Sequence, residues 1–131
     1  MKTKHLITAT CGLMACAFVA AAPANAKKLS SSEIRSTISD KRVMLATRWG
    51  GFPLVYDSSK RVTGDGTGLG LARFFAPKET GNWWVKSGQL CQKFPTWYRG
   101  RTFCFTLTKT GPKELKWVRE DGYSGTATIT N

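Results

Sequence analysis

The chain has 131 residues, of which 41% are hydrophobic and 11% aromatic, and 20 Lys and Arg against 8 Asp and Glu give it a formal net charge of +12. This composition excludes a disordered chain and a collagen-like repeat, and the length suits one globular domain. The one histidine, His5, lies in an N-terminal segment that we expect to be removed. Its loss excludes Ser/His/Asp and Cys/His catalysis and histidine-ligated metals in the mature protein.

Residues 1–26 have the pattern of a cleaved signal peptide. A basic start is followed by the mostly apolar stretch 6–22 and by an A-x-A cleavage site at Ala24-Asn25-Ala26. Two alternatives stay open, an uncleaved membrane anchor and a lipoprotein whose Cys16 carries the lipid. The sequence therefore predicts a periplasmic or secreted protein. Cleavage removes two lysines, which leaves 18 basic and 8 acidic residues and a net charge of +10 on the mature chain.

Residues 27–131 are predicted to form a single, mainly β domain with one short helix. Ser30 and Glu33 have the spacing of a capping box, and Ile34 and Ile38 follow four positions apart, which predicts a helix near 31–39. Further along the chain, short apolar runs alternate with period two between turn residues, and no later helix is predicted. The predicted strands are 42–49, 52–57, 60–64, 69–76, 82–87, 89–94, 102–109, 114–120 and 124–130.

Short sequential strands of this number have too many edges to stay open and uncovered. We therefore expect an antiparallel meander that closes into a small barrel or half-barrel of lipocalin-like size, with the helix over an end or an edge. A β-sandwich is the alternative. After signal cleavage, no transmembrane segment is expected.

A register argument predicts a disulfide. A two-residue turn at Ser87-Gly88 pairs Val85 with Leu90 and Trp84 with Cys91. Trp83, Val85 and Leu90 then face the core, and the next strand offers a matching apolar face. Cys91 and Cys104 fall together on the opposite, outer face, which predicts that they are bonded. Closing this loop contributes on the order of 3 kcal/mol.

The last hairpin is predicted to contain a bulge. A strict two-residue Asp121-Gly122 turn would place Leu115 and Trp117 opposite threonines and waste the core face. One extra residue in the turn, with Gly122 in the left-handed conformation, instead places Ala127 and Ile129 beside Leu115 and Trp117.

Two motifs that resemble catalytic or metal sites do not fit their context. The glycine-rich segment 64–70 precedes a predicted strand and lacks a Gly-Lys-Ser/Thr signature, so we interpret it as a flexible hairpin loop rather than a phosphate-binding loop. Asp65 lacks the further carboxylates of a calcium loop. A carboxylate-dependent hydrolase would need two of the eight acidic residues in one cleft, and all of them fall in the helix or beside turns. We expect no enzymatic activity, no cofactor and no metal.

The loop closed by the predicted disulfide combines aromatic and basic residues. Aromatic faces stack on sugars or bases, and arginine binds carboxylates and phosphates through two donors. A binding surface here would consist of Trp97, Tyr98, Arg99 and Arg101, with the outward-facing Trp84 beside it. The alternative is packing, in which Trp97 fills one barrel end, Trp84 covers the disulfide and the arginines are only solvated.

An ordered set of residues resembles a group of short exported alphaproteobacterial proteins to which no activity is assigned. The pattern is Gly81-x-Trp83-Trp84, Leu90-Cys91, Trp97, Cys104 and Asp121-Gly122. The resemblance covers most of residues 40 to 130. It implies export and a compact β domain, and it assigns no functional residue.

The sequence thus predicts an exported, non-enzymatic binding or envelope-accessory protein. Its positive charge favours an acidic partner such as a glycan, a lipid head group or another polyanion. Nucleic acid fits the charge equally well, but the predicted compartment argues against it. A secreted protein inhibitor or host-interaction factor that presents the disulfide-closed loop is the alternative, and a stoichiometric protein complex would distinguish it.

Overall fold

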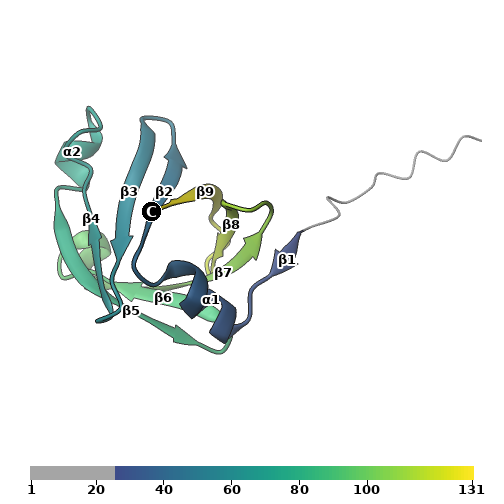
Figure 1. Cartoon of the computed structure of the whole chain (residues 1–131). Helices are drawn as coiled ribbons and strands as arrows, with labels where there is room; N and C mark the ends of the chain where they lie inside the picture. Colours follow the sequence, from purple (N-terminus) through teal and green to yellow (C-terminus); the bar gives the residue numbers. More distant parts are fainter. Residues whose placement is uncertain (1–25) are drawn as a thin grey trace, which may run out of the picture.

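The structure is a computed structural model that describes residues 26–131, so the predicted signal peptide lies outside the described residues except for Ala26. Strands dominate the domain (Figure 1). In chain order the elements are β1 (Lys27–Lys28), α1 (Ser31–Ile38), β2 (Lys41–Thr47), β3 (Gly50–Tyr56), β4 (Arg61–Gly64), α2 (Ala72–Phe75), β5 (Glu79–Lys86), β6 (Gln89–Lys93), the 3₁₀ turn η1 (Trp97–Gly100), β7 (Thr102–Lys109), β8 (Glu114–Arg119) and β9 (Ser124–Thr130).

Within the described residues, eight strands close into an antiparallel barrel. Each strand from β2 to β8 pairs with the next strand in the sequence, and β9 pairs back with β2, where Val43 faces Ile129. The short β1 adds to the edge of β7 beyond the barrel. Closure leaves none of these eight strands as an open edge. The predicted small barrel is confirmed, and the sandwich alternative is not adopted.

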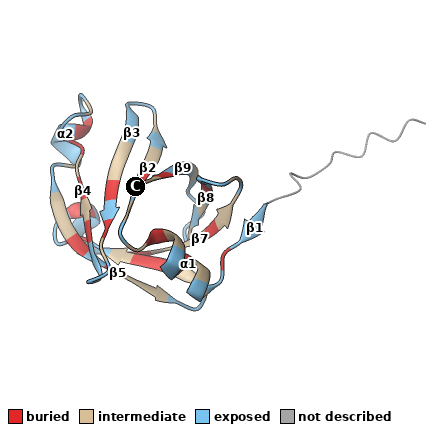
Figure 2. Ribbon diagram, in the orientation of Figure 1, coloured by how far each residue is buried: buried red, intermediate tan, exposed pale blue. Residues whose placement is uncertain are grey.

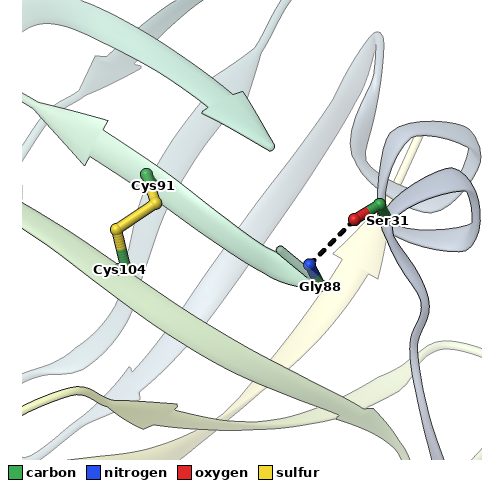
Figure 3. Close-up of a disulfide and its surroundings, with 4 residues drawn as sticks. All are labelled: Ser31, Gly88, Cys91 and Cys104. Atoms are coloured by element: carbon green, nitrogen blue, oxygen red, sulfur yellow. Dashed lines mark hydrogen bonds between the residues drawn. A yellow bond between two sulfur atoms is a disulfide. The ribbon is translucent and has the colours of Figure 1, made fainter. Parts of the chain in front are cut away.

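Helix α1 closes one end of this barrel. The Ser30 side chain accepts from the backbone N–H of Glu33, whose carboxylate accepts from the Ser30 N–H, so the predicted capping box is present. Ile34 and Ile38 on the next turns are fully buried in the core. The Ser31 hydroxyl accepts from the backbone N–H of Gly88 at 2.8 Å, which ties the helix to the β5–β6 hairpin (Figure 3).

The capping box predicts an acid-sensitive contribution to stability. Hydrogen bonds from Lys27, first, and from Ser30 lower the pKa of Glu33 from 4.5 to about 2. A carboxyl with a depressed pKa stabilises the fold above its unfolded pKa and loses that contribution as pH falls through its folded pKa. We therefore expect the gap in melting temperature between wild type and Glu33→Gln to be constant above pH 4.5 and to close toward about pH 2. A gap that does not change with pH would contradict this role.

The core is formed by buried residues of α1 and of every strand from β2 to β9, together with Phe94 and Trp97 of the 94–101 connection (Figure 2). Trp83 on β5 is 1% exposed, and its indole N–H donates to the Asp57 carbonyl at 2.9 Å. The edge of its ring meets Tyr56, with ring centroids 5.8 Å apart. The predicted core position of Trp83 is confirmed.

Both predicted hairpin registers are found, the second with one difference. Across the Ser87-Gly88 turn, Val85 pairs with Leu90 and Trp84 with Cys91. In the last hairpin Gly122 has φ +94° and Leu115 pairs with Ala127, as the bulged loop requires. However, Trp117 faces Gly125 rather than Ala127 or Ile129. A Cβ at position 125 would lie 2.6 Å from the Trp117 ring, so only glycine leaves room for it.

The strand predicted over 69–76 is wrong. These residues form turns and the short helix α2, with Gly70 at φ +54°. The reason lies in the neighbouring strands, because β4 and β5 pair directly with each other, Val62 opposite Gly81. The segment between them therefore has no sheet edge to join. The expectation of no helix after α1 is wrong at α2, whereas η1 is a turn in which Tyr98 and Arg99 have φ of 52° and 58°.

Candidate ligand-binding cavity

The barrel end opposite α1 is formed by four connections. Because successive strands alternate in direction, the β3–β4, β5–β6 and β7–β8 turns lie at the end that α1 covers. The other four connections lie at the opposite end, which we call the open end: residues 48–49, 65–78, 94–101 and 120–123. Figure 1 shows α2 and the tip of the β2–β3 hairpin far from α1.

Two adjoining cavities occupy the barrel interior among the described residues. The outer cavity, about 400 Å³, begins at the open end, where Trp49 and Phe75 line it. The inner cavity, about 110 Å³, extends from Ile38 of α1 to Arg101 and Arg119. The two share lining residues that are mostly apolar: Leu45, Leu54, Gln92, Phe94, Tyr98 and Trp117. Ligand sites in proteins are commonly mostly apolar cavities of about 300–1,000 Å³ with a few polar groups, and this interior fits that description.

Four uncharged polar side chains stand out on the cavity walls. The buried Tyr56 hydroxyl donates to the Gln92 side-chain oxygen at 2.7 Å, and burial raises the pKa of Tyr56, which keeps the phenol neutral. The indole N–H groups of Trp97 and Trp117 are buried without an acceptor in the described part of the chain. A buried donor without a partner costs about 1–3 kcal/mol, so an acceptor that reached these groups would gain from them.

Arg119 contacts several side chains at the side of the open end next to β7. Its guanidinium donates twice to the Asp121 carboxylate, both at 2.7 Å, and these bonds lower the pKa of Asp121. Its guanidinium carbon lies 4.2 Å from the Phe103 ring centroid and 4.6 Å from that of Tyr123. The Asp121 carboxylate neutralises the guanidinium, and the contacts with the two rings restrict its position. Arg119 is therefore a wall residue whose charge is already paired.

Arg101 differs from Arg119 in having no carboxylate partner. Its guanidinium carbon lies 5.1 Å from the Phe103 ring centroid, and the residue is exposed at the mouth of the inner cavity. Among residues 26–131 the ion pairs are Lys27–Glu33 and Arg119–Asp121. The positive charge of Arg101 is thus left available beside an apolar interior.

The loop that was predicted to carry a binding surface packs its tryptophan inward. Trp97 is 9% exposed, stacks on Phe94 with centroids 4.3 Å apart and meets the edge of Phe52. The Glu79 carboxylate accepts from the backbone N–H groups of Thr96 at 2.7 Å and Trp97 at 3.2 Å, which anchors the loop to β5. The predicted exposed stacking face of Trp97 is not found, because its indole packs inward as in the packing alternative. A ligand-binding role for Trp97 stays a prediction.

The other predicted site residues are not all brought together. Tyr98 lines both cavities and Arg101 lines the inner one, whereas Arg99 is exposed and lines neither. Trp84 also lines neither, because it lies on the outer wall opposite Cys91. A ligand-binding role for Arg99 and Trp84 stays a prediction.

The predicted disulfide between Cys91 and Cys104 is confirmed (Figure 3). The two cysteines are direct cross-strand partners on β6 and β7, with Cα atoms 4.0 Å apart. Trp84, Cys91 and Cys104 form one row across three strands, on the face opposite the core. The bond thus joins two barrel strands below the loop that carries Tyr98 and Arg101.

Sequence reasoning missed two residues of the cavity wall, Gln92 and Arg119. The alternation that placed Leu90 in the core also places Gln92, two positions on, in the interior. In the same way Leu115 and Trp117 predict that Arg119 faces inward. The signal was present, but it was not applied to these two polar residues.

The acidic side chains near the open end mostly support backbone turns. Asp65 accepts from the backbone N–H and the hydroxyl of Thr67, and Glu79 anchors the 94–101 loop. Within the described residues, no three His, Cys, Asp or Glu side chains group closely enough to hold a metal ion. No helix among residues 26–131 has the length and apolar character needed to cross a bilayer.

Fold and cavity together define a small up-and-down β-barrel with an apolar interior and an arginine at its mouth. Comparison with protein-family models, with curated proteins and with solved structures gives no match for this chain.

Proposed function

We propose that the protein is an exported, non-enzymatic binding protein whose barrel takes a small amphipathic acid. The apolar part of the ligand enters the cavities, and its acidic group meets Arg101 at the mouth. One observation carries the proposal: an apolar interior of ligand size ends at an arginine that no carboxylate within residues 26–131 neutralises.

Both halves of such a ligand gain from this arrangement. Each methylene moved from water into the interior contributes about 0.8 kcal/mol. The acidic group replaces water around Arg101 with a charge-assisted hydrogen bond, which contributes about 1.5–3 kcal/mol. The Gln92 amide and the indole N–H groups of Trp97 and Trp117 add donors within the same walls. These contributions favour an acid over a neutral or cationic molecule of the same shape.

The arrangement of carboxylates supports binding rather than hydrolysis. A glycosidase-type site needs two carboxyl groups on either side of a bound substrate. The lining of the two cavities contains no Asp or Glu. Of the carboxylates near the open end, Asp121 is paired with Arg119, and Glu79 accepts from the backbone of the 94–101 loop. The charged side chains that line the inner cavity are arginines, which suits the binding of an acidic ligand.

A displacement assay tests the proposal. The protein is loaded with anilinonaphthalenesulfonate, an apolar anion that becomes fluorescent on burial, and is titrated with decanoate, decanol or decyltrimethylammonium. These three competitors share one alkyl chain and differ in head group. We expect decanoate to displace the dye at concentrations at least about tenfold lower than decanol, and the cation to be the weakest.

Three results would contradict the proposal. Equal displacement by all three competitors would mean that the arginine takes no part. Failure of every competitor would mean that the interior takes no alkyl chain. Binding of a protein in a stoichiometric complex, with no effect of decanoate, would instead support the inhibitor alternative.

A further inference from the structure

Four large apolar side chains are exposed together at one side of the open end. Trp49 is 41% exposed, Leu71 61%, Phe74 66% and Phe75 74%. We call these four residues the apolar tip. Single exposed apolar residues are ordinary, but a cluster of large ones on a soluble domain marks an interaction surface.

The residues of the tip come from two connections that lie side by side. Trp49 belongs to the β2–β3 turn, and the other three belong to the segment around α2. A Cβ at Gly50 would lie 3.6 Å from the Leu69 side chain, and Trp49 and Phe75 line the same outer cavity. Figure 1 shows both connections at the end of the molecule farthest from α1. The tip is therefore continuous with the wall of the outer cavity at the open end.

Cations lie among these apolar side chains. The Arg48 guanidinium carbon lies 4.4 Å from the Trp49 ring centroid, and that of Arg73 lies 4.7 Å from the Phe74 ring centroid. Residues 41–56 and 66–78 contain no Asp or Glu, and the carboxylate of Asp65, at the start of the second connection, accepts from Thr67. Neither guanidinium has a carboxylate partner within residues 26–131.

Aromatic side chains beside arginines suit the boundary between an anionic bilayer and water. Tryptophan side chains prefer the level of the lipid head groups, where arginine guanidinium groups meet the phosphates. Leucine and phenylalanine side chains enter the acyl region below. Anionic lipids add attraction for each cation near the surface. A protein interface would instead need a broad surface of about 800 Å² on each partner, which four side chains on two turns do not supply.

We propose that the apolar tip docks the protein on an anionic lipid bilayer with the open end toward the membrane. Docked in this way, the barrel would hold the mouth of its cavity against the lipid. A ligand with an apolar chain could then pass between bilayer and barrel without crossing water. Docking rests on the tip alone, and only this route for the ligand rests on the proposed function.

Sedimentation with vesicles tests the docking. Wild type is mixed with vesicles of phosphatidylcholine alone or of phosphatidylcholine with phosphatidylglycerol, at physiological salt. The variant is Leu71→Ser/Phe74→Ser, which keeps every charge and changes two side chains that line neither cavity. The matched control is Val55→Ser/Val118→Ser, which changes two valines of the barrel wall that are 39% and 38% exposed.

We expect wild type to bind the anionic vesicles and the tip variant to bind them at least about tenfold more weakly, because insertion scales with buried apolar area. The valine control should bind like wild type. Arg48→Gln/Arg73→Gln should reduce the preference for anionic over zwitterionic vesicles. Displacement of the dye by decanoate should be unchanged in the tip variant.

Equal vesicle binding by the tip variant and wild type would overturn the docking proposal, since attraction to net charge alone would then explain the binding. Wild type that fails to sediment would overturn it as well. A tip that mediates self-association would show as a concentration-dependent dimer that the variant abolishes, with no vesicle binding, and this would also contradict docking. If wild type bound the anionic vesicles but did not bind decanoate, the result would contradict the proposed cavity function and leave the docking proposal standing.

Discussion

Replacement of Trp97 by alanine should lower the free energy of unfolding by about 3–5 kcal/mol, the range for removing a large buried aromatic side chain. The indole stacks on Phe94, meets Phe52 and lies against Gly64, where a Cβ would be 2.4 Å from its ring. Truncation removes these contacts and joins the empty space to the outer cavity. Urea unfolding of wild type and variant measures the loss.

Two further variants calibrate this result. Trp83→Ala removes a side chain of the same size from the closed half of the core and should cost about as much as Trp97→Ala. Trp84→Ala removes a half-buried indole from the outer wall and should cost clearly less. If Trp97→Ala unfolded at the same urea concentration as wild type, Trp97 would be a surface residue. That result would support the exposed binding loop predicted from the sequence.

Arg101→Gln should weaken decanoate binding by about 10- to 100-fold, because it removes a charge-assisted hydrogen bond of about 1.5–3 kcal/mol. Decanol has no charge to lose, so its affinity should change by less than about threefold on the same scale. The substitution keeps an unbranched polar side chain at an exposed position, so the fold should stay intact. Titration against the displaced dye gives both affinities.

Arg99→Gln is the matched control for Arg101→Gln. Arg99 lies two positions away on the same loop, is exposed and lines neither cavity. Its replacement should leave decanoate affinity nearly unchanged. If the two variants lost affinity equally for decanoate, the binding surface would be the outer face of the loop, as one sequence-based interpretation holds, and the mouth of the cavity would not be the site.

Alternation within strands carried most of what the sequence could predict. It placed Trp83 and Leu90 in the core, set Trp84 opposite Cys91 and brought Cys91 to Cys104, because period two fixes both the face and the register of a hairpin. Barrel closure followed from the number of sequential strands and the cost of open edges.

Residues in connections could not be placed by the same reasoning. Trp97 lies in a loop, where no period says which way a side chain points, and its burial depends on Gly64 of a strand distant in sequence. The apolar residues of 69–76 resemble a strand locally, but the direct pairing of β4 with β5 leaves that segment outside the sheet. Both misplacements are decided by contacts that no local pattern contains.

The cavity is a property of the closed barrel rather than of any one strand. An eight-stranded barrel is wide enough to be filled by large side chains or to hold one small ligand, depending on the side chains that point inward. Here small inward-facing residues such as Ala127 stand among the large ones. How much space they leave depends on all the strands together, so no single strand pattern in the sequence could predict the cavity.

The indole N–H signals of the five tryptophans offer the most direct test of binding inside the barrel. In a ¹H–¹⁵N spectrum of the full domain, addition of decanoate should shift the signals of Trp97 and Trp117, which line the outer cavity. The signal of Trp84 on the outer wall should stay in place. A shift of Trp84, with Trp97 and Trp117 unmoved, would place the ligand outside the barrel and contradict the account.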